Sequence, residues 1–107
     1  MGKRTDPARI VTWIQSRLPD QFDPKTLADV VSSSLEEIIN NNLSYGRQPI
    51  TFDSVRRIVD FFRNYTMREV ADEFKEKGFP IDRQTLDEIK KLFDNVKDEL
   101  RKNYYEG

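Results

Sequence analysis

Apolar residues recur at intervals of three and four along this chain, and the longest uninterrupted series lies near its C-terminus. The series consists of Leu86, Ile89, Phe93, Val96 and Leu100, and Tyr104 extends it. This spacing places the side chains on one face of an α-helix. Because neither glycine nor proline interrupts residues 83–104, the series predicts a single long helix of about 30 Å.

Proline residues mark the start and end of other predicted helices. Asp6-Pro7 and Asp23-Pro24 each combine an N-cap carboxylate with proline at the first helical position, where the missing amide donor costs nothing. Pro19 ends the first of these helices. We therefore predict an all-α chain, a compact bundle of about five helices. They span residues 7–18, 24–43, 52–64, 67–77 and 83–104.

The length and composition indicate one folded unit. A chain of 107 residues is large enough for one hydrophobic core without disulfides or metal ions. Hydrophobic residues make up 36% of the chain and charged residues 35%, which is typical of a folded but highly charged protein. We predict a single helical domain over residues 1–107, with a flexible tail at residues 1–5.

Two residue types are missing from the sequence, and their absence excludes several classes of catalytic and metal-binding site. The sequence has no cysteine and no histidine, which excludes disulfides, zinc sites built from these residues, catalytic thiols and imidazole acid–base catalysis. It also has no glycine-rich phosphate loop and no metal-ligand spacing. We expect no catalytic residues, no metal, no cofactor and no enzymatic activity. Since its apolar runs are only a few residues long, we expect no membrane association and a cytoplasmic location.

Residues 66–92 carry the most specific local pattern, which predicts two helices joined by a tight turn. Thr66 and Glu69 have the spacing of a capping box, in which each side chain accepts from a backbone amide at a helix start. Gly78 predicts the end of that helix, because glycine enters the left-handed backbone region without a Cβ clash. Asp82 is the candidate N-cap of the next helix.

A short helix, a glycine-containing turn and a second helix are the parts of a helix-turn-helix DNA reader. With the helix at 52–64 as support, we predict a helix-turn-helix-like unit over residues 52–92, without a wing. Residues 55–92 resemble the N-terminal winged-helix domain of arginine repressors in their Thr-x-x-Glu start, Lys-x-x-Gly-aromatic turn and Gln-Thr before an apolar helix. The resemblance covers about a third of the chain and implies binding of double-stranded DNA in transcription regulation. The chain departs from that family at Asp87-Glu88, where the repressors carry Ser-Arg, and in continuing as helix where their wing follows.

A DNA-binding role assigns contacts to the start of the last helix and to basic residues around it. The candidate base contacts are Arg83, Gln84 and Thr85. The candidate phosphate contacts are Arg56, Arg57, Arg68 and Lys91. In the alternative interpretation, the first three are ordinary first-turn and capping residues. The net charge of −1 and the neighbouring acids Asp82, Asp87 and Glu88 oppose binding to phosphates.

A second hypothesis is a helical protein–protein interaction module, such as an accessory subunit or adaptor, that binds no nucleic acid. The near-neutral charge and the coiled-coil-like spacing of the last helix favour it. Its candidate interface residues are Leu100, Tyr104 and Tyr105 on that helix and Arg47 in the preceding long loop. The apolar face of the last helix either packs inside the bundle or pairs with a second copy, and we favour intramolecular packing.

Overall fold

The computed structural model of the protein describes residues 7–20, 23–44 and 50–106. The predicted tail at residues 1–5 and the candidate interface residue Arg47 lie outside these ranges. The described residues form four helices and no strand, which confirms the all-α prediction. The helices are α1 (Pro7–Gln15), α2 (Pro24–Ser44), α3 (Phe52–Glu76) and α4 (Arg83–Tyr104).

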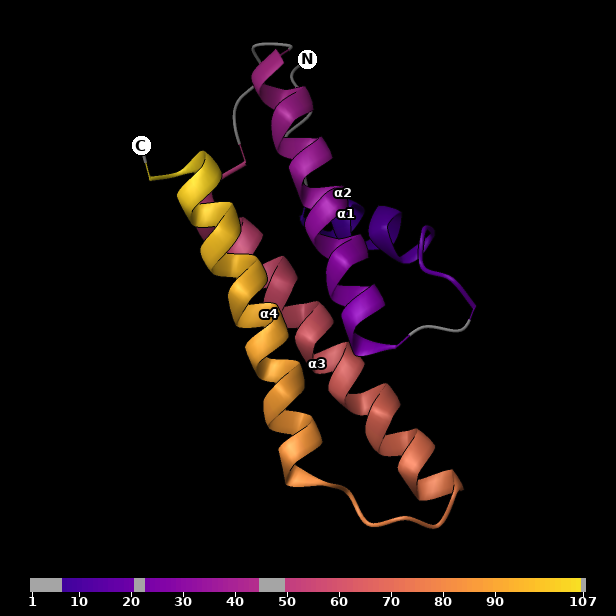
Figure 1. The fold of residues 1–107 in the computed structure, drawn as a ribbon. Coiled ribbons are helices and arrows are strands. Elements are labelled where there is room, and N and C mark those ends of the chain that lie inside the picture. The colour runs from indigo at the N-terminus through magenta and orange to yellow at the C-terminus, as the bar shows by residue number, and fades with distance from the viewer. Residues whose placement is uncertain (1–6, 21–22, 45–49, 107) are drawn as a thin grey trace.

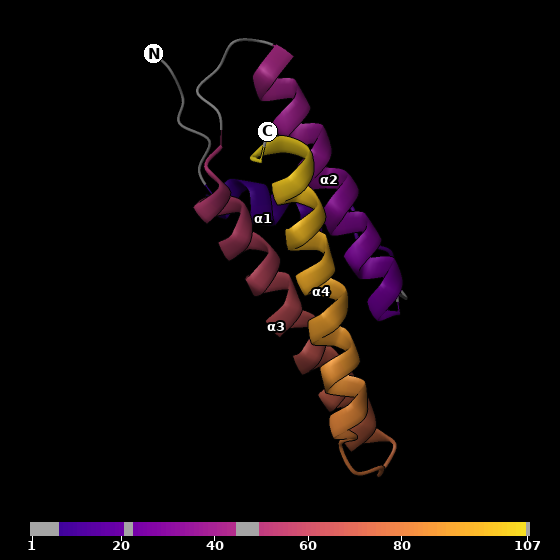
Figure 2. The same cartoon turned by 60° about the vertical axis from the view of Figure 1, so that its left-hand side comes forward.

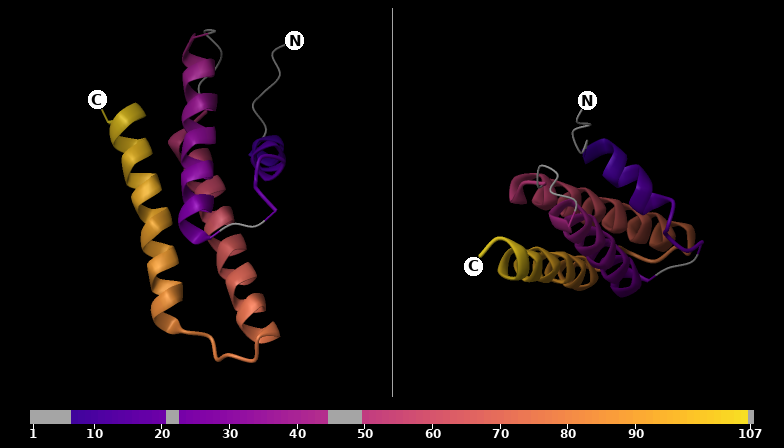
Figure 3. Two further views of the ribbon diagram at one scale, coloured as in Figure 1. Left: turned by 45° about the vertical axis from the view of Figure 1, so that its right-hand side comes forward. Right: turned by 90° about the horizontal axis from the view of Figure 1, so that it is seen from above.

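The three long helices α2, α3 and α4 run in alternating directions along one bundle (Figure 1). Helix α3 runs antiparallel to α2, and α4 returns antiparallel to α3, as a second view also shows (Figure 2). The short helix α1 lies on the side of the α2–α3 pair that faces away from α4 (Figure 3). The four helices therefore share one interior, and α2 and α3 lie between α1 and α4.

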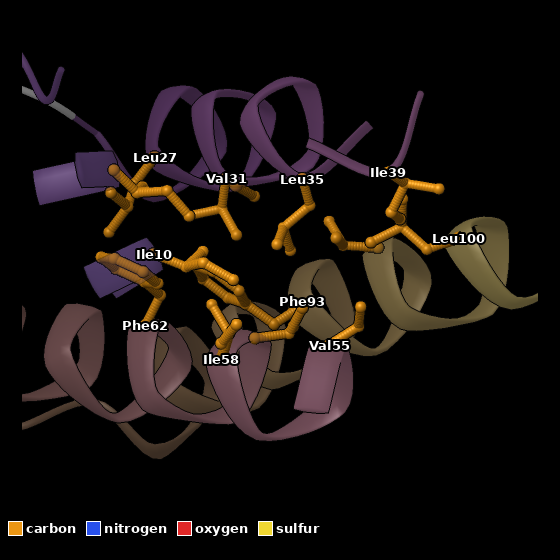
Figure 4. Close-up of a cluster of buried hydrophobic side chains, with 14 of the residues drawn as sticks. Ile10, Leu27, Val31, Leu35, Ile39, Val55, Ile58, Phe62, Phe93 and Leu100 are labelled. Atoms are coloured by element: carbon orange, nitrogen blue, oxygen red, sulfur yellow. The ribbon is translucent and has the colours of Figure 1, made fainter. Parts of the chain in front are cut away.

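The core is built from the apolar faces of all four helices (Figure 4). Phe62 of α3 and Phe93 of α4 are the largest side chains with no exposed surface, and Phe93 lies near the middle of the cluster. Its other members are Ile10, Ile14, Leu27, Ala28, Val31, Leu35, Ile39, Ile50, Val55, Ile58, Val59, Ile89, Val96 and Leu100. The apolar face of the last helix thus packs inside the bundle, as predicted.

Helix α3 is continuous, so the predicted helix end at residues 64–66 is wrong. Thr66 is fully buried inside α3, and its hydroxyl donates to the Phe62 carbonyl oxygen at 2.7 Å. It therefore does not cap a new helix over residues 67–77. Thr66 continues the buried face four residues after Phe62, and no glycine or proline stands nearby to interrupt the backbone hydrogen bonds.

The helix-turn-helix-like unit over residues 52–92 is consequently not confirmed. Its first two predicted helices, 52–64 and 67–77, are one helix, and the five predicted helices become four within the described residues. Residues 52–104 form a long antiparallel hairpin of α3 and α4. In a helix-turn-helix, by contrast, two short helices cross at a steep angle.

The other predicted ends lie close to the observed ones. Asp23 caps α2, since its carboxylate accepts from the Thr26 amide at 2.6 Å. Helix α1 was expected to reach Leu18 but ends at Gln15. The amide of Leu18 bonds to the carbonyl three residues back, at 3.2 Å, and this tighter turn leads the chain into Pro19.

The connection between α3 and α4 is held at both ends by local hydrogen bonds. Gly78 has a φ of +74°, and the amide of Phe79 donates to the Phe74 carbonyl at 2.9 Å, which is a Schellman motif. On the far side, Asp82 accepts from the Gln84 amide at 3.0 Å and so caps α4. Both of these predicted features are confirmed, and together they fix the shape of the turn.

Candidate functional site

The α3–α4 hairpin extends beyond the rest of the bundle. Helix α2 begins beside the middle of α3, and the turn end of the hairpin continues past it (Figure 1). The buried residues reflect this: those of α3 end at Thr66, and those of α4 begin at Ile89. The hairpin tip, defined here as residues 77–82, therefore projects into solvent.

Two large apolar side chains lie on this tip without cover. Phe79 is 62% exposed and Ile81 is 55% exposed, the highest fractions among the large apolar residues that the structure describes. Pro80 between them is also exposed. More than half of each of these two side chains thus remains accessible to solvent.

An open groove runs beside the projecting half of α3. Its other wall is formed by Asp20 in the α1–α2 connection and by Pro24 at the start of α2. The α3 side is lined by Thr66, Glu69, Val70, Asp72, Glu73 and Glu76. We call these eight residues the acidic groove, because five of them carry carboxylates.

Only one of these carboxylates has a cation beside it in the described part of the chain. The Lys77 ammonium lies 2.8 Å from Glu73, and this hydrogen bond raises the pKa of Lys77 above its usual value of 10.5. No ion pair joins the other four carboxylates to any residue within the described ranges. The groove therefore has a net negative charge.

The predicted base contacts lie just after the hairpin tip. Arg83 and Gln84 are exposed on the first turn of α4. Thr85 is half-buried, and its hydroxyl donates to the Asp82 carboxylate at 3.2 Å. The alternative interpretation of Thr85 as a capping residue is therefore the one that fits its observed contact.

The predicted phosphate contacts do not gather around the predicted base contacts. Arg56 and Arg57 lie near the start of α3 and both pair with Asp53, at 2.6 and 3.1 Å. This part of α3 packs beside the end of α4, so it is separated from Arg83 by roughly the length of the hairpin, on the order of 25 Å at 1.5 Å per residue. Arg68 and Lys91 are exposed further along the hairpin. The seven candidates thus form no single basic surface.

The predicted interface residues of α4 make contacts within the protein. Leu100 has no exposed surface. The Tyr105 hydroxyl donates to the Ile50 carbonyl at 2.6 Å, and its ring centre lies 5.4 Å from that of Phe52. The Tyr104 hydroxyl accepts from the Asn40 side-chain nitrogen Nδ2 at 3.3 Å. These side chains hold α4 against the bundle.

The chain matches no known family model, no curated protein and no solved structure. The resemblance of residues 55–92 to arginine repressors therefore stays a prediction. No helix of the described ranges has the length and apolarity needed to cross a membrane. Among those same residues, no three acidic side chains gather closely enough to hold a metal ion.

Neither the apolar tip nor the acidic groove was predicted from the sequence. A signal for the groove exists once α3 is treated as continuous. Val55, Ile58 and Phe62 are followed at the same spacing of three and four by Thr66, and then by Glu69, Glu73 and Glu76. One face of α3 thus changes from apolar to acidic at the point where α2 stops covering it.

Proposed function

We propose that this protein is a helical protein–protein interaction module that binds its partner with the projecting end of the α3–α4 hairpin. The observation that carries the proposal is the exposure of Phe79 and Ile81, at 62% and 55%, on a tip that packs against no other helix. Large apolar side chains in such positions are typical anchors of protein interfaces.

The tip has two properties that favour binding. Burying a whole Phe or Ile side chain contributes about 1.5–3 kcal/mol, so covering the exposed half of each contributes roughly 1 kcal/mol per residue. The Schellman motif at Gly78 and the Asp82 cap also fix the backbone on both sides of the tip. A preformed surface loses less conformational entropy on binding than a flexible one.

Binding of double-stranded DNA is the second candidate, and the exposure of Arg83 and Gln84 at the start of α4 is the observation in its favour. Three features count against it. The helix-turn-helix-like unit is not confirmed, the proposed phosphate contacts lie at separate places along the hairpin, and the exposed acids Asp82, Asp87 and Glu88 flank the proposed base contacts in sequence. A protein partner is therefore the better-supported proposal.

A peptide-display selection against the purified full-length protein tests the two candidates. We expect peptides that bind the wild type and lose at least tenfold in affinity for a Phe79→Ser/Ile81→Ser variant. The matched control is Trp13→Ser/Phe61→Ser, which removes two other exposed apolar side chains, at 37% and 44% exposure, from the bundle itself. Circular dichroism checks that each variant keeps its helices.

Two results would overturn the proposal. One is a selection that yields no peptide sensitive to the tip variant. The other is tight binding of mixed DNA duplexes at low salt that an Arg83→Ala substitution weakens and the tip variant leaves unchanged.

A further inference from the structure

The acidic groove continues a helix face that is buried elsewhere in the same helix. In the first half of α3, this face packs Val55, Ile58 and Phe62 into the core. In the second half, it presents acidic side chains, and the start of α2 forms only the opposite wall of the groove. The acidic face of the second half of α3 is thus left uncovered, while α4 packs on another side of the same helix.

The charges on this face work against the stability of α3. Glu69 and Glu73 stand four residues apart, and Glu73 and Glu76 three apart, and like charges at these spacings destabilise a helix by about 0.2–0.5 kcal/mol per pair. Glu73 and Glu76 also lie in the last turns, next to the negative end of the helix dipole. Among the described residues, Lys77 is the one cation that forms an ion pair with them, and Lys75 adds a positive charge in the last turn. The fold alone does not account for this arrangement.

Charge complementarity restricts what can cover the groove. A second copy that docks symmetrically through the same groove would place its own carboxylates against these, and DNA or an anionic membrane surface would be repelled in the same way. A segment rich in lysine and arginine would instead pair with the four carboxylates that have no cation in the described part of the chain. The occupant that fits is a basic one.

The length and lining of the groove also indicate the shape of the segment that would fill it. Residues 66–76 of α3 span about 15 Å at 1.5 Å per residue, which corresponds to roughly ten residues of a helix lying alongside. Val70 on the α3 wall and Pro24 on the opposite wall add apolar side chains to the lining. At its far end, Glu76 directly precedes the tip that carries Phe79 and Ile81.

We infer that the acidic groove binds a basic amphipathic helix of a partner protein, with lysines or arginines against Glu69, Asp72 and Glu76 and apolar residues towards Phe79 and Ile81. This inference rests on the proposed function, because it names the partner chemistry for the same end of the hairpin. The groove supplies the charge selectivity, and the tip supplies the apolar contact.

The test uses a labelled 18-residue helical peptide with leucines at intervals of three and four and lysines at the other positions. Its counterpart carries glutamate at every lysine position. We expect the lysine peptide to bind the full-length protein, more weakly as salt rises, and the glutamate peptide not to bind. A Glu69→Gln/Asp72→Asn/Glu76→Gln variant should bind the lysine peptide about tenfold more weakly, as expected from losing three partly exposed ion pairs.

The matched control removes the same number of charges outside the groove. An Asp29→Asn/Asp98→Asn/Glu99→Gln variant, altered on α2 and on the C-terminal half of α4, should change the affinity less than twofold. Equal weakening by both triple variants, binding of the glutamate peptide, or no binding of the lysine peptide would overturn the inference. The proposed function would still stand in those cases if displayed peptides depend on Phe79 and Ile81, so the two failures are distinguishable.

Discussion

The Lys97 ammonium lies 2.9 Å from the Asp60 carboxylate, an ion pair that joins α4 to α3. The Lys97 side chain is only 19% exposed and also pairs with Asp94 at 3.1 Å. Burial by itself lowers the pKa of Lys97, but the hydrogen bonds to Asp60 and Asp94 outweigh it and raise this pKa above the usual 10.5. The cation therefore contributes to the register in which the two helices of the hairpin pack.

Replacing Lys97 with methionine should lower the free energy of unfolding by about 1 kcal/mol. The loss stays moderate because Arg63 lies 3.6 Å from Asp60 and continues to offset its charge. Urea denaturation at neutral pH measures the change. Lys102→Met, at an exposed position of α4, is the control and should have little effect. Equal stability of the two variants would show that the interhelical pair contributes nothing.

The continuity of α3 can be tested by comparing two threonines. Thr51 is the observed N-cap of α3 and accepts from the Ser54 amide at 3.2 Å, whereas Thr66 is buried within the helix. Thr51→Val should cost about 1 kcal/mol of unfolding free energy through loss of the cap. Thr66→Val keeps the volume and leaves the Phe62 carbonyl in its backbone hydrogen bond, so we expect a change within about 0.5 kcal/mol. The reverse order in thermal or urea unfolding would favour two separate helices.

The two threonines also illustrate how far the sequence determines the fold. Asp23-Pro24, Gly78 and Asp82 were assigned correctly because the chemistry of a helix end is local: a carboxylate meets a free amide, or a glycine enters the left-handed region. The Thr66–Glu69 pair has the same local appearance. What overrides it is tertiary, since Thr66 falls on the buried face of α3 and is covered by the core.

The candidate site depended on information that no local pattern contains. Exposure of Phe79 and Ile81 follows from where α2 begins relative to α3, which is set by the packing of the whole bundle. Conversely, Leu100 was proposed for an interface and is buried, because the apolar face of α4 is used against α2 and α3. The spacing correctly predicted an apolar face but could not say which partner covers it.

Gly78 should tolerate few substitutions, although an added Cβ would meet nothing within 4 Å. Its φ of +74° is the obstacle, because side chains with a Cβ disfavour this conformation by about 1–2 kcal/mol. We expect Gly78→Ala to lower the free energy of unfolding by about 1 kcal/mol and Gly78→Asn to lower it less, as asparagine tolerates left-handed backbone. Urea denaturation compares the two. Alanine as stable as glycine would mean that the Schellman motif is not maintained in solution.

Asp23 should give the protein part of its sensitivity to acid. Hydrogen bonds from the Thr26 side chain and its backbone amide lower the pKa of Asp23 below the usual 3.8. The unfolded chain therefore takes up this proton at a higher pH than the folded protein does, so the stabilisation is present above pH 3.8 and is lost as the pH falls through the folded-state pKa. Asp23→Ser keeps a capping oxygen that cannot ionise, whereas Asp23→Ala removes the cap at every pH. In thermal unfolding between neutral pH and about pH 2, the stability advantage of the wild type over the serine variant should disappear at the acidic end. The alanine variant should already be less stable than the serine variant at neutral pH. If the serine variant lost thermal stability on acidification as steeply as the wild type, Asp23 would not be a source of the acid sensitivity.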